Sequence, residues 1–125
     1  MRKLWLLACL TGVLSAADIA GKWTGTVDVE DPTDGTTIST QVRAEFRQQA
    51  DKISGAIGRQ EDKDVESIQN AKLDGKRLTF EVSSAETSGL FKFVLTLDGD
   101  RLDGEMSGSM DGNSINGKVH LSRQP

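Results

Sequence analysis

Hydrophobic and polar residues alternate along most of the chain, beginning at Trp23. In this first stretch Trp23, Gly25, Val27 and Val29 share one face, and the residues between them are polar or charged. A period of two residues is that of a β-strand with one buried face, because successive side chains point to opposite sides. The pattern therefore predicts a first strand that places Trp23 in a core.

The same alternation returns in later stretches and predicts about eight strands in total. The polar residues 60–66 interrupt it, and a bulge is needed between Ile68 and Ala71 because their parity is opposite. No window has the spacing of a long amphipathic helix. The residues predicted to face inward in the later strands are Ile38, Thr40, Val42, Ala44, Phe46, Ile53, Gly55, Ile57, Leu78, Phe80, Val82, Phe91, Phe93, Leu95, Leu97, Leu102, Gly104, Met106, Gly108, Met110, Ile115, Gly117, Val119 and Leu121.

Tight turns separate several of these strands. The segments Leu73–Leu78 and Leu97–Leu102 are near copies with an Asp-Gly pair each, and Gly75 and Gly99 lie 99 − 75 = 24 residues apart. Asp-Gly between alternating stretches is typical of a β-hairpin whose two central residues have positive φ. Short strands joined by hairpins favour an all-β fold, a single small antiparallel up-and-down β-barrel, because closure removes exposed edges. An open β-sandwich is the alternative.

The N-terminus has the pattern of a secretory signal peptide, with a basic start, an apolar run from Leu4 to Leu14 and small residues at 15–17. Cleavage is predicted after Ala17, which leaves residues 18–125 as one β-barrel domain of a secreted or periplasmic bacterial protein. Cys9 follows Leu-Leu-Ala, as in the lipobox of bacterial lipoproteins. Lipidation is the less favoured alternative, because the apolar run before Cys9 is shorter than the roughly 7–15 residues of a signal peptide.

Charge and composition narrow the classes of partner. Loss of residues 1–17 removes Arg2 and Lys3 and takes the formal net charge from −4 to −4 − 2 = −6. An acidic surface without a basic cluster or a tyrosine argues against a nucleic-acid partner. After Leu14 no segment approaches the roughly 20 apolar residues of a transmembrane helix, so no membrane span is predicted.

The tripeptide Gly21-Lys22-Trp23 at the start of the first strand resembles the Gly-x-Trp signature of the calycins, the superfamily of lipocalins, fatty-acid-binding proteins and avidins. The resemblance implies a β-barrel in which a basic residue near the end of the last strand packs over the tryptophan. Arg123 has the required inward parity, so Trp23 and Arg123 are predicted to form a structural pair. The chain also resembles small secreted bacterial proteins that begin with a Gly-Lys-Trp strand, which implies a fold and no activity.

The candidate chemical groups do not combine into a catalytic or metal site. His120 is the single histidine and has outward parity, which leaves neither a Ser-His-Asp triad nor a histidine-rich metal site. The acidic groups within 61–66 and 98–105 lack the Asp-x-Asp-x-Asp-Gly spacing of a calcium loop. The sequence therefore predicts a protein that is not an enzyme and that uses no metal or cofactor.

Two functions remain open. The first is the binding of a small hydrophobic molecule inside the barrel, where flexible methionines adapt to irregular ligands. The second is a structural or protein-interaction module whose interior is full, since an eight-stranded barrel is just wide enough for side chains to fill it. The inward glycines fit either, as space for a ligand or as bends in the strands. The predicted ligand-binding residues are Trp23, Phe46, Phe80, Phe91, Phe93, Met106 and Met110.

Overall fold

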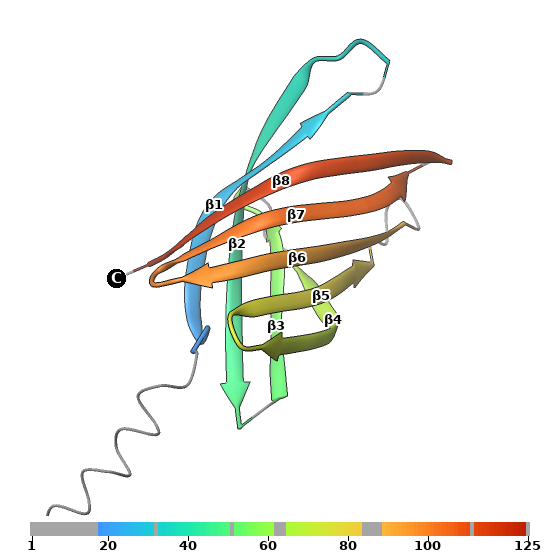
Figure 1. Cartoon of the computed structure of the whole chain (residues 1–125). Helices are drawn as coiled ribbons and strands as arrows, with labels where there is room; N and C mark the ends of the chain where they lie inside the picture. Colours follow the sequence, from blue (N-terminus) through green and yellow to red (C-terminus); the bar gives the residue numbers. More distant parts are fainter. Residues whose placement is uncertain are drawn as a thin grey trace, which may run out of the picture.

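The chain forms a closed antiparallel β-barrel in which each strand pairs with its neighbours in sequence and β8 pairs with β1 (Figure 1). The computed structural model describes residues 18–31, 33–50, 52–61, 65–83, 89–110 and 112–124. The strands are β1 (Gly21–Glu30), β2 (Thr37–Gln49), β3 (Lys52–Arg59), β4 (Glu66–Asp74), β5 (Arg77–Ser83), β6 (Leu90–Asp98), β7 (Arg101–Met110) and β8 (Asn113–Arg123).

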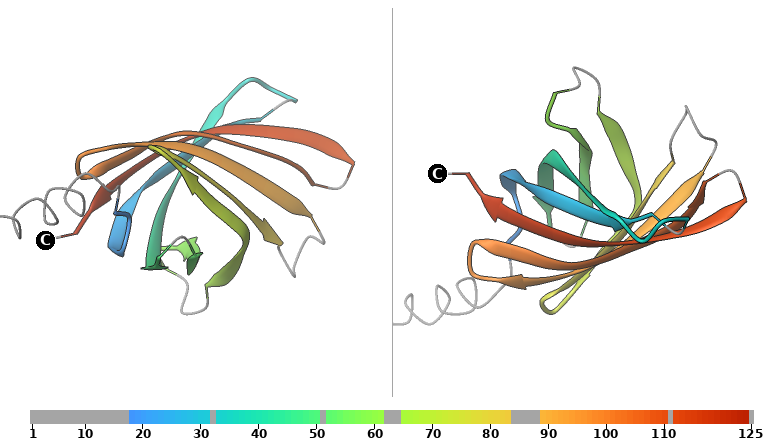
Figure 2. Two further views of the ribbon diagram at one scale, coloured as in Figure 1. Left: turned by 60° about the horizontal axis from the view of Figure 1, so that its bottom comes forward. Right: turned by 90° about the horizontal axis from the view of Figure 1, so that it is seen from above.

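This architecture confirms the predicted up-and-down barrel and excludes the open sandwich. Figure 2 shows the strands arranged around a common axis. Within the described ranges no helix is long and apolar enough to cross a membrane. The predicted signal peptide, residues 1–17, lies outside the described part of the chain.

The two near-copy segments form equivalent hairpins at one end of the barrel. Asp74 pairs with Arg77 and Asp98 with Arg101, so each turn consists of the two residues between them. The turns therefore begin at the glycine and not at the aspartate, and Gly75 and Gly99 have φ of 63° and 62°. Only the first central residue is in the left-handed region, which corrects the prediction of two positive φ values. Glycine adopts that region without steric cost.

The inward parity predicted from the sequence matches the core. The buried hydrophobic residues come from β1, β2, β3, β5, β6, β7 and β8, together with Ile19 before β1. Among these, Trp23, Phe46 and Phe80 are the largest side chains that are almost completely inaccessible to solvent. Because polar residues occupy the opposite face of each strand, the core lies inside the barrel.

β4 is the irregular strand. Its pairing with β5 shifts between Gln69 and Lys72, and Asn70 has a φ of 53°. The Asn70 Nδ2 donates to Glu81 Oε1 on β5 at 2.7 Å. The bulge predicted between Ile68 and Ala71 is thus confirmed, and it lets both residues pack against the core.

The β1–β2 hairpin extends beyond the body of the barrel (Figure 1). β1 and β2 pair as far as Glu30 and Thr37, whereas the β2–β3 ladder begins only at Val42 with Arg59. Ile38, predicted to face the core, is 56% exposed, because no further strand continues beside this part of β2 among the described residues. The side chain of Ile38 has inward parity, but this part of β2 extends beyond the interior of the barrel.

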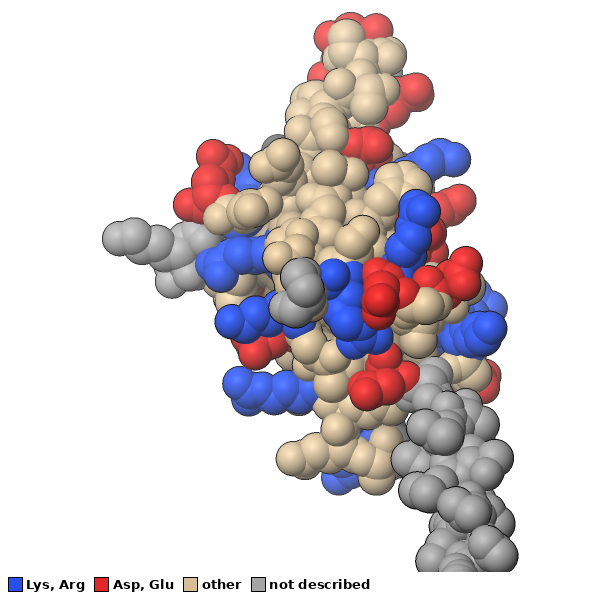
Figure 3. Space-filling view, turned by 90° about the vertical axis from the view of Figure 1, so that its left-hand side faces the viewer, with Lys and Arg blue, Asp and Glu red and all other residues tan. Residues whose placement is uncertain are grey.

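The tip of this hairpin is acidic, and Figure 3 shows Asp and Glu atoms at the top of the projection. Asp31 and Asp34 each accept hydrogen bonds from residues two positions later in the turn. The backbone N–H and then the hydroxyl of Thr36 donate to the Asp34 carboxylate and hold its pKa below its ordinary value. The tip therefore remains negatively charged at neutral pH.

Candidate functional site

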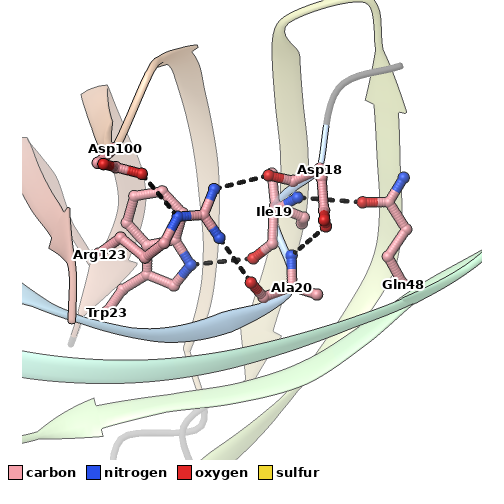
Figure 4. Close-up of polar contacts among 7 residues, drawn as sticks. All are labelled: Asp18, Ile19, Ala20, Trp23, Gln48, Asp100 and Arg123. Carbon is pink, nitrogen blue, oxygen red and sulfur yellow. Dashed lines mark hydrogen bonds and ion pairs between the residues drawn. The ribbon is translucent and has the colours of Figure 1, made fainter. Parts of the chain in front are cut away.

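The closed end of the barrel is organised around Trp23 and Arg123 (Figure 4). Trp23 pairs with Arg123 across the β1–β8 ladder, and the guanidinium carbon lies 4.5 Å from the centroid of the indole ring. Trp23 is 0% exposed. Arg123 thus occupies the position over the ring that the sequence predicts for it, where a cation is attracted by the face of the indole.

Arg123 also ties the segment before β1 to the end of the barrel. Its Nη1 donates to the Ala20 carbonyl at 2.6 Å and its Nη2 to the Asp18 carbonyl at 2.7 Å. Its Nε donates to Asp100 Oδ1 at 3.0 Å in the β6–β7 turn. The planar fork of a guanidinium suits such divergent acceptors, whereas a lysine offers a single point charge.

Ile19 plugs this end of the barrel. Its side chain is fully buried, its N–H donates to Gln48 Oε1 at 3.1 Å, and its carbonyl accepts from Trp23 Nε1 at 2.9 Å. These bonds satisfy polar groups that burial would otherwise leave without a partner. Trp23 therefore serves to close the barrel through its ring face and its N–H together.

Arg123→Ala is expected to lower the free energy of unfolding by about 2–3 kcal/mol, because it removes a ring contact and charge-assisted hydrogen bonds. Arg123→Lys keeps the charge and should cost about 1 kcal/mol. Urea denaturation followed by circular dichroism measures both values. Asp100→Ala is the control: the Asp100 side chain is 80% exposed, so losing this ion pair should cost less than about 0.5 kcal/mol. A loss in Arg123→Ala no larger than in Asp100→Ala would contradict the assigned role.

A ladder of aromatic rings fills the middle of the barrel. Phe80 stacks on Phe93 with centroids 4.8 Å apart, and Phe46 lies 5.8 Å from Phe80 in a tilted arrangement. Phe46 and Phe80 are 1% and 2% exposed, so neither borders a void that a water molecule can enter. Ring pairs of this kind stabilise a core beyond their buried area.

Three of the inward glycines are explained by close approach of neighbouring strands. A Cβ at Gly25 would overlap the His120 carbonyl oxygen, one at Gly55 the Glu45 carbonyl oxygen, and one at Gly104 the Val94 carbonyl oxygen. The space beside each glycine is therefore occupied by backbone. This favours the interpretation of these glycines as bends that close the barrel over their interpretation as space for a ligand.

The ladder between β3 and β4 has the fewest paired residues of the ladders that the structure describes. Their ladder consists of Ala56 with Ser67 and Ile57 with Glu66, after which the two strands no longer pair. Both sides of this interruption carry apolar residues that are partly buried and packed against the core: Ile53 on β3, and Ile68, Ala71 and Leu73 on β4. We refer to these four residues as the apolar strip.

Phe46 and Phe80 lie behind the apolar strip. Phe46 on β2 is paired with Gly55, which has no side chain, and Phe80 is on β5. Since β3 and β4 stand between β2 and β5 in the strand order, the contact between the two rings passes beneath the interruption. The apolar strip is partly exposed to solvent and packs against the core to which these two buried rings belong.

A concavity lies beside the protruding hairpin, away from the apolar strip. It has a volume of about 420 Å³ and is lined by Ser39, Thr40, Gln41, Arg59, Gln60 and Glu61. Its lining is polar, and it contains none of the residues predicted to bind a ligand. It is the space next to β2 where β3 has ended.

Comparison with known proteins adds little to this description. No protein-family model matches the chain, and no curated protein does. Among solved structures, the chain is similar to a crystal structure of a mutant of the fluorescent protein UnaG, with 11% sequence identity and a TM-score of 0.46, over 86% of this chain and 96% of that chain. The resemblance to calycins carried by Gly21-Lys22-Trp23 therefore rests on the tripeptide, Arg123 and the barrel itself.

The predicted ligand-binding residues fall into distinct environments. Trp23, Phe46, Phe80 and Phe93 belong to the buried core, whereas Phe91 and Met106 are partly buried and packed against it. The ring of Phe91 lies against Gly108 on β7, where a Cβ would overlap it. The side chain of Met110 lies outside the described part of the structure. Their role in binding stays a prediction.

The polar candidates lie on the outer surface. His120 Nδ1 is 2.8 Å from Asp103 Oδ1 on the neighbouring strand, and both side chains are solvent-accessible. In the part of the chain that the structure describes, no group of histidine, cysteine and acidic residues is arranged to hold a metal ion. His120 thus belongs to a surface pair across the β7–β8 ladder.

Sequence reasoning did not find the apolar strip or the buried Ile19. Parity identified Ile53 as an inward residue and required a bulge between Ile68 and Ala71, but it did not indicate the loss of pairing between β3 and β4. Ile19 precedes the first alternating stretch, so period counting does not include it. A signal was nevertheless present in the opposite parity of Ile68 and Ala71, which requires an irregular β4.

Proposed function

We propose that the protein is a non-enzymatic binding protein that takes a small apolar molecule at the apolar strip. The observation that carries this proposal is the partial exposure of Ile53, Ile68, Ala71 and Leu73 on both sides of an interrupted β-ladder, directly before the ring pair of Phe46 and Phe80. Ligand sites are mostly apolar and concave, and binding is driven by removal of such surface from water.

The solid part of the core restricts where the ligand lies. Trp23, Leu78 and Leu95 are 0% exposed, so the closed end offers no space for a guest without repacking. A ligand seated between β3 and β4 needs the two strands to separate further, and they are held by the fewest residue pairs of any neighbouring strands. Binding is therefore expected to begin at the strip and to displace little of the aromatic ladder.

The proposal includes the compartment. A secreted or periplasmic protein without catalytic groups can carry or sequester an apolar molecule that is poorly soluble in water. Support for this compartment comes from the signal-peptide pattern of residues 1–17. The alternative function, a structural or protein-interaction module, requires only a filled interior and no small ligand.

Titration with 8-anilinonaphthalene-1-sulfonate tests the site, because this dye fluoresces when it enters an apolar environment. The folded protein is expected to bind the dye with a single affinity. Ile53→Glu should weaken binding about tenfold or more, which corresponds to about 1.4 kcal/mol, because it places a charge in the strip.

Val94→Glu is the matched control, since Val94 is 38% exposed, has outward parity on β6 and is separated from β4 by the whole of β5. Its affinity for the dye should equal that of the wild type. Circular dichroism spectra and melting curves establish that both variants are folded. Equal affinity of Ile53→Glu and Val94→Glu, with both folded, rejects the strip as the site. Native mass spectrometry of protein purified from its own organism then identifies the molecule that is bound there.

A further inference from the structure

Where the hairpin leaves the barrel, one edge of β2 has no partner strand among the described residues. On one side, Thr37 to Thr40 pair with β1. On the other side, the last contact with β3 is the hydrogen bond from the Gln60 N–H to the Gln41 carbonyl, at 2.9 Å. Backbone groups of alternate residues point to the same side of a strand. The backbone carbonyl of Gln41 points toward β3. The backbone N–H and C=O groups of Thr37 and Ser39 therefore point to the same edge of β2.

The exposure and composition of this edge suit pairing with another strand. Thr37, Ile38 and Ser39 are all exposed, and no described strand pairs with them on this side. The concavity of about 420 Å³ begins at Ser39 and continues along Thr40 and Gln41. The segment Thr-Ile-Ser-Thr-Gln contains no charge and no proline, the usual means by which natural proteins prevent edge pairing. Its threonines and isoleucine favour strands.

Ile38 identifies the register of such a pairing. It is 56% exposed, the highest exposure among the large hydrophobic residues that the structure describes. Its backbone groups point toward β1, so in an added antiparallel strand it would stand at a position without inter-strand hydrogen bonds. Side chains directly opposite each other are closest at such positions, with Cα atoms about 4.5 Å apart.

We propose that two copies of this chain associate through this edge, with β2 of one copy antiparallel to β2 of the other. Ile38 faces Ile38 of the second copy on the two-fold axis, and Thr37 exchanges backbone hydrogen bonds with Ser39 of the second copy on each side of it. The same surface serves both partners, as a two-fold interface requires. An exposed isoleucine and unpaired backbone groups are covered in one step.

Charge favours this arrangement over a parallel one. Asp34 lies four residues from Ile38, about 13 Å along an extended strand, so antiparallel pairing puts the two acidic tips about 27 Å apart on opposite sides of the axis. This distance exceeds the Debye length of about 8 Å at physiological ionic strength. Parallel pairing would place the two tips side by side. The paired segment itself is uncharged, so it adds no repulsion.

The contact is short, so the dimer is expected to be weak and concentration-dependent. Sedimentation velocity over roughly 10 µM to 1 mM, a range suited to weak association, should show the sedimentation coefficient of the wild type rising toward that of a dimer. Ile38→Asp places like charges directly opposite each other and should leave a monomer at all concentrations. Val94→Asp, which also adds an acidic group at an exposed apolar position, should dimerise like the wild type.

Cross-linking tests the register. In a Cys9→Ser background the chain has no other cysteine, so Ile38→Cys introduces a single thiol. The Cα separation across the axis suits a disulfide, so mild oxidation should give a covalent dimer, whereas Val94→Cys should give at least tenfold less. A monomeric wild type at every concentration overturns the proposal. Equal cross-linking of the two cysteine variants, or dimerisation of Ile38→Asp, overturns the assigned edge. Dye binding at the apolar strip is unaffected by either result.

Discussion

Trp23→Ala is expected to lower the free energy of unfolding by about 3–5 kcal/mol. Trp23 is 0% exposed, and its removal leaves a large void at the closed end of the barrel. It also removes the donor to the Ile19 carbonyl and the ring beneath Arg123. A buried carbonyl without its partner adds to the cost. Urea unfolding followed by far-ultraviolet circular dichroism gives the value without depending on tryptophan fluorescence.

Trp23→Phe separates the contribution of the ring's apolar contacts to stability from that of its N–H hydrogen bond. Phenylalanine keeps most of the apolar contact with Arg123 but leaves the Ile19 carbonyl unpaired, so a loss of about 1–2 kcal/mol is expected. A loss below about 1 kcal/mol in Trp23→Ala would show that the closed end does not depend on this residue. The strand containing Gly21-Lys22-Trp23 would then have no special part in closing the barrel.

Gly25→Ala is expected to destabilise the protein by about 3 kcal/mol or more, at the upper end of the cost of overpacking. The added methyl group would overlap the His120 carbonyl oxygen and come within 2.8 Å of the Leu121 Cα. Backbone atoms cannot move aside as a flexible side chain can. The substitution therefore forces β1 and β8 apart at the seam that closes the barrel.

Gly117→Ala is the matched control on the same seam. A Cβ at Gly117 would lie 3.0 Å from the Asp28 carbonyl oxygen and 3.1 Å from a Val29 methyl group, contacts that a small shift relieves. We expect a loss of about 1 kcal/mol, at the low end of overpacking. Chemical denaturation compares the two directly, and similar losses would contradict the assignment of Gly25 as a site of backbone contact.

Trp23 and Gly25 both contribute to closing the barrel, and where the barrel is closed restricts where a ligand can bind. Trp23, Ile19 and Arg123 close one end of the barrel, so the proposed ligand is expected to bind at the β3–β4 interruption and not at that end. The uncovered β2 edge lies at the other end of the barrel. Ligand binding at the strip and association through the edge therefore use separate surfaces and can be tested independently.

The alternation of apolar and polar residues determined the strands and the composition of the core. A strand alternates its side chains whatever it pairs with, so parity placed Phe80, Leu95 and Val119 inside before their partners were known. The Asp-Gly repeats determined where hairpins form. Arg123 was placed over Trp23 by the parity of β8 together with the resemblance to calycins, because neighbours in a closed barrel bring the ends of the chain together.

Only the tertiary structure decided which inward positions are covered. Ile38 and Val42 have the same parity in one strand, yet Ile38 is exposed because β3 ends beside Val42. From the sequence, Gly25 could provide space for a ligand or mark a bend in the strand. The His120 carbonyl oxygen occupies the space beside Gly25, which favours the bend. The apolar strip exists because β3 and β4 stop pairing at Ser67, just before the bulge between Gln69 and Lys72. Parity is a property of one strand, whereas burial depends on the length and path of its neighbours, which lie far away in sequence.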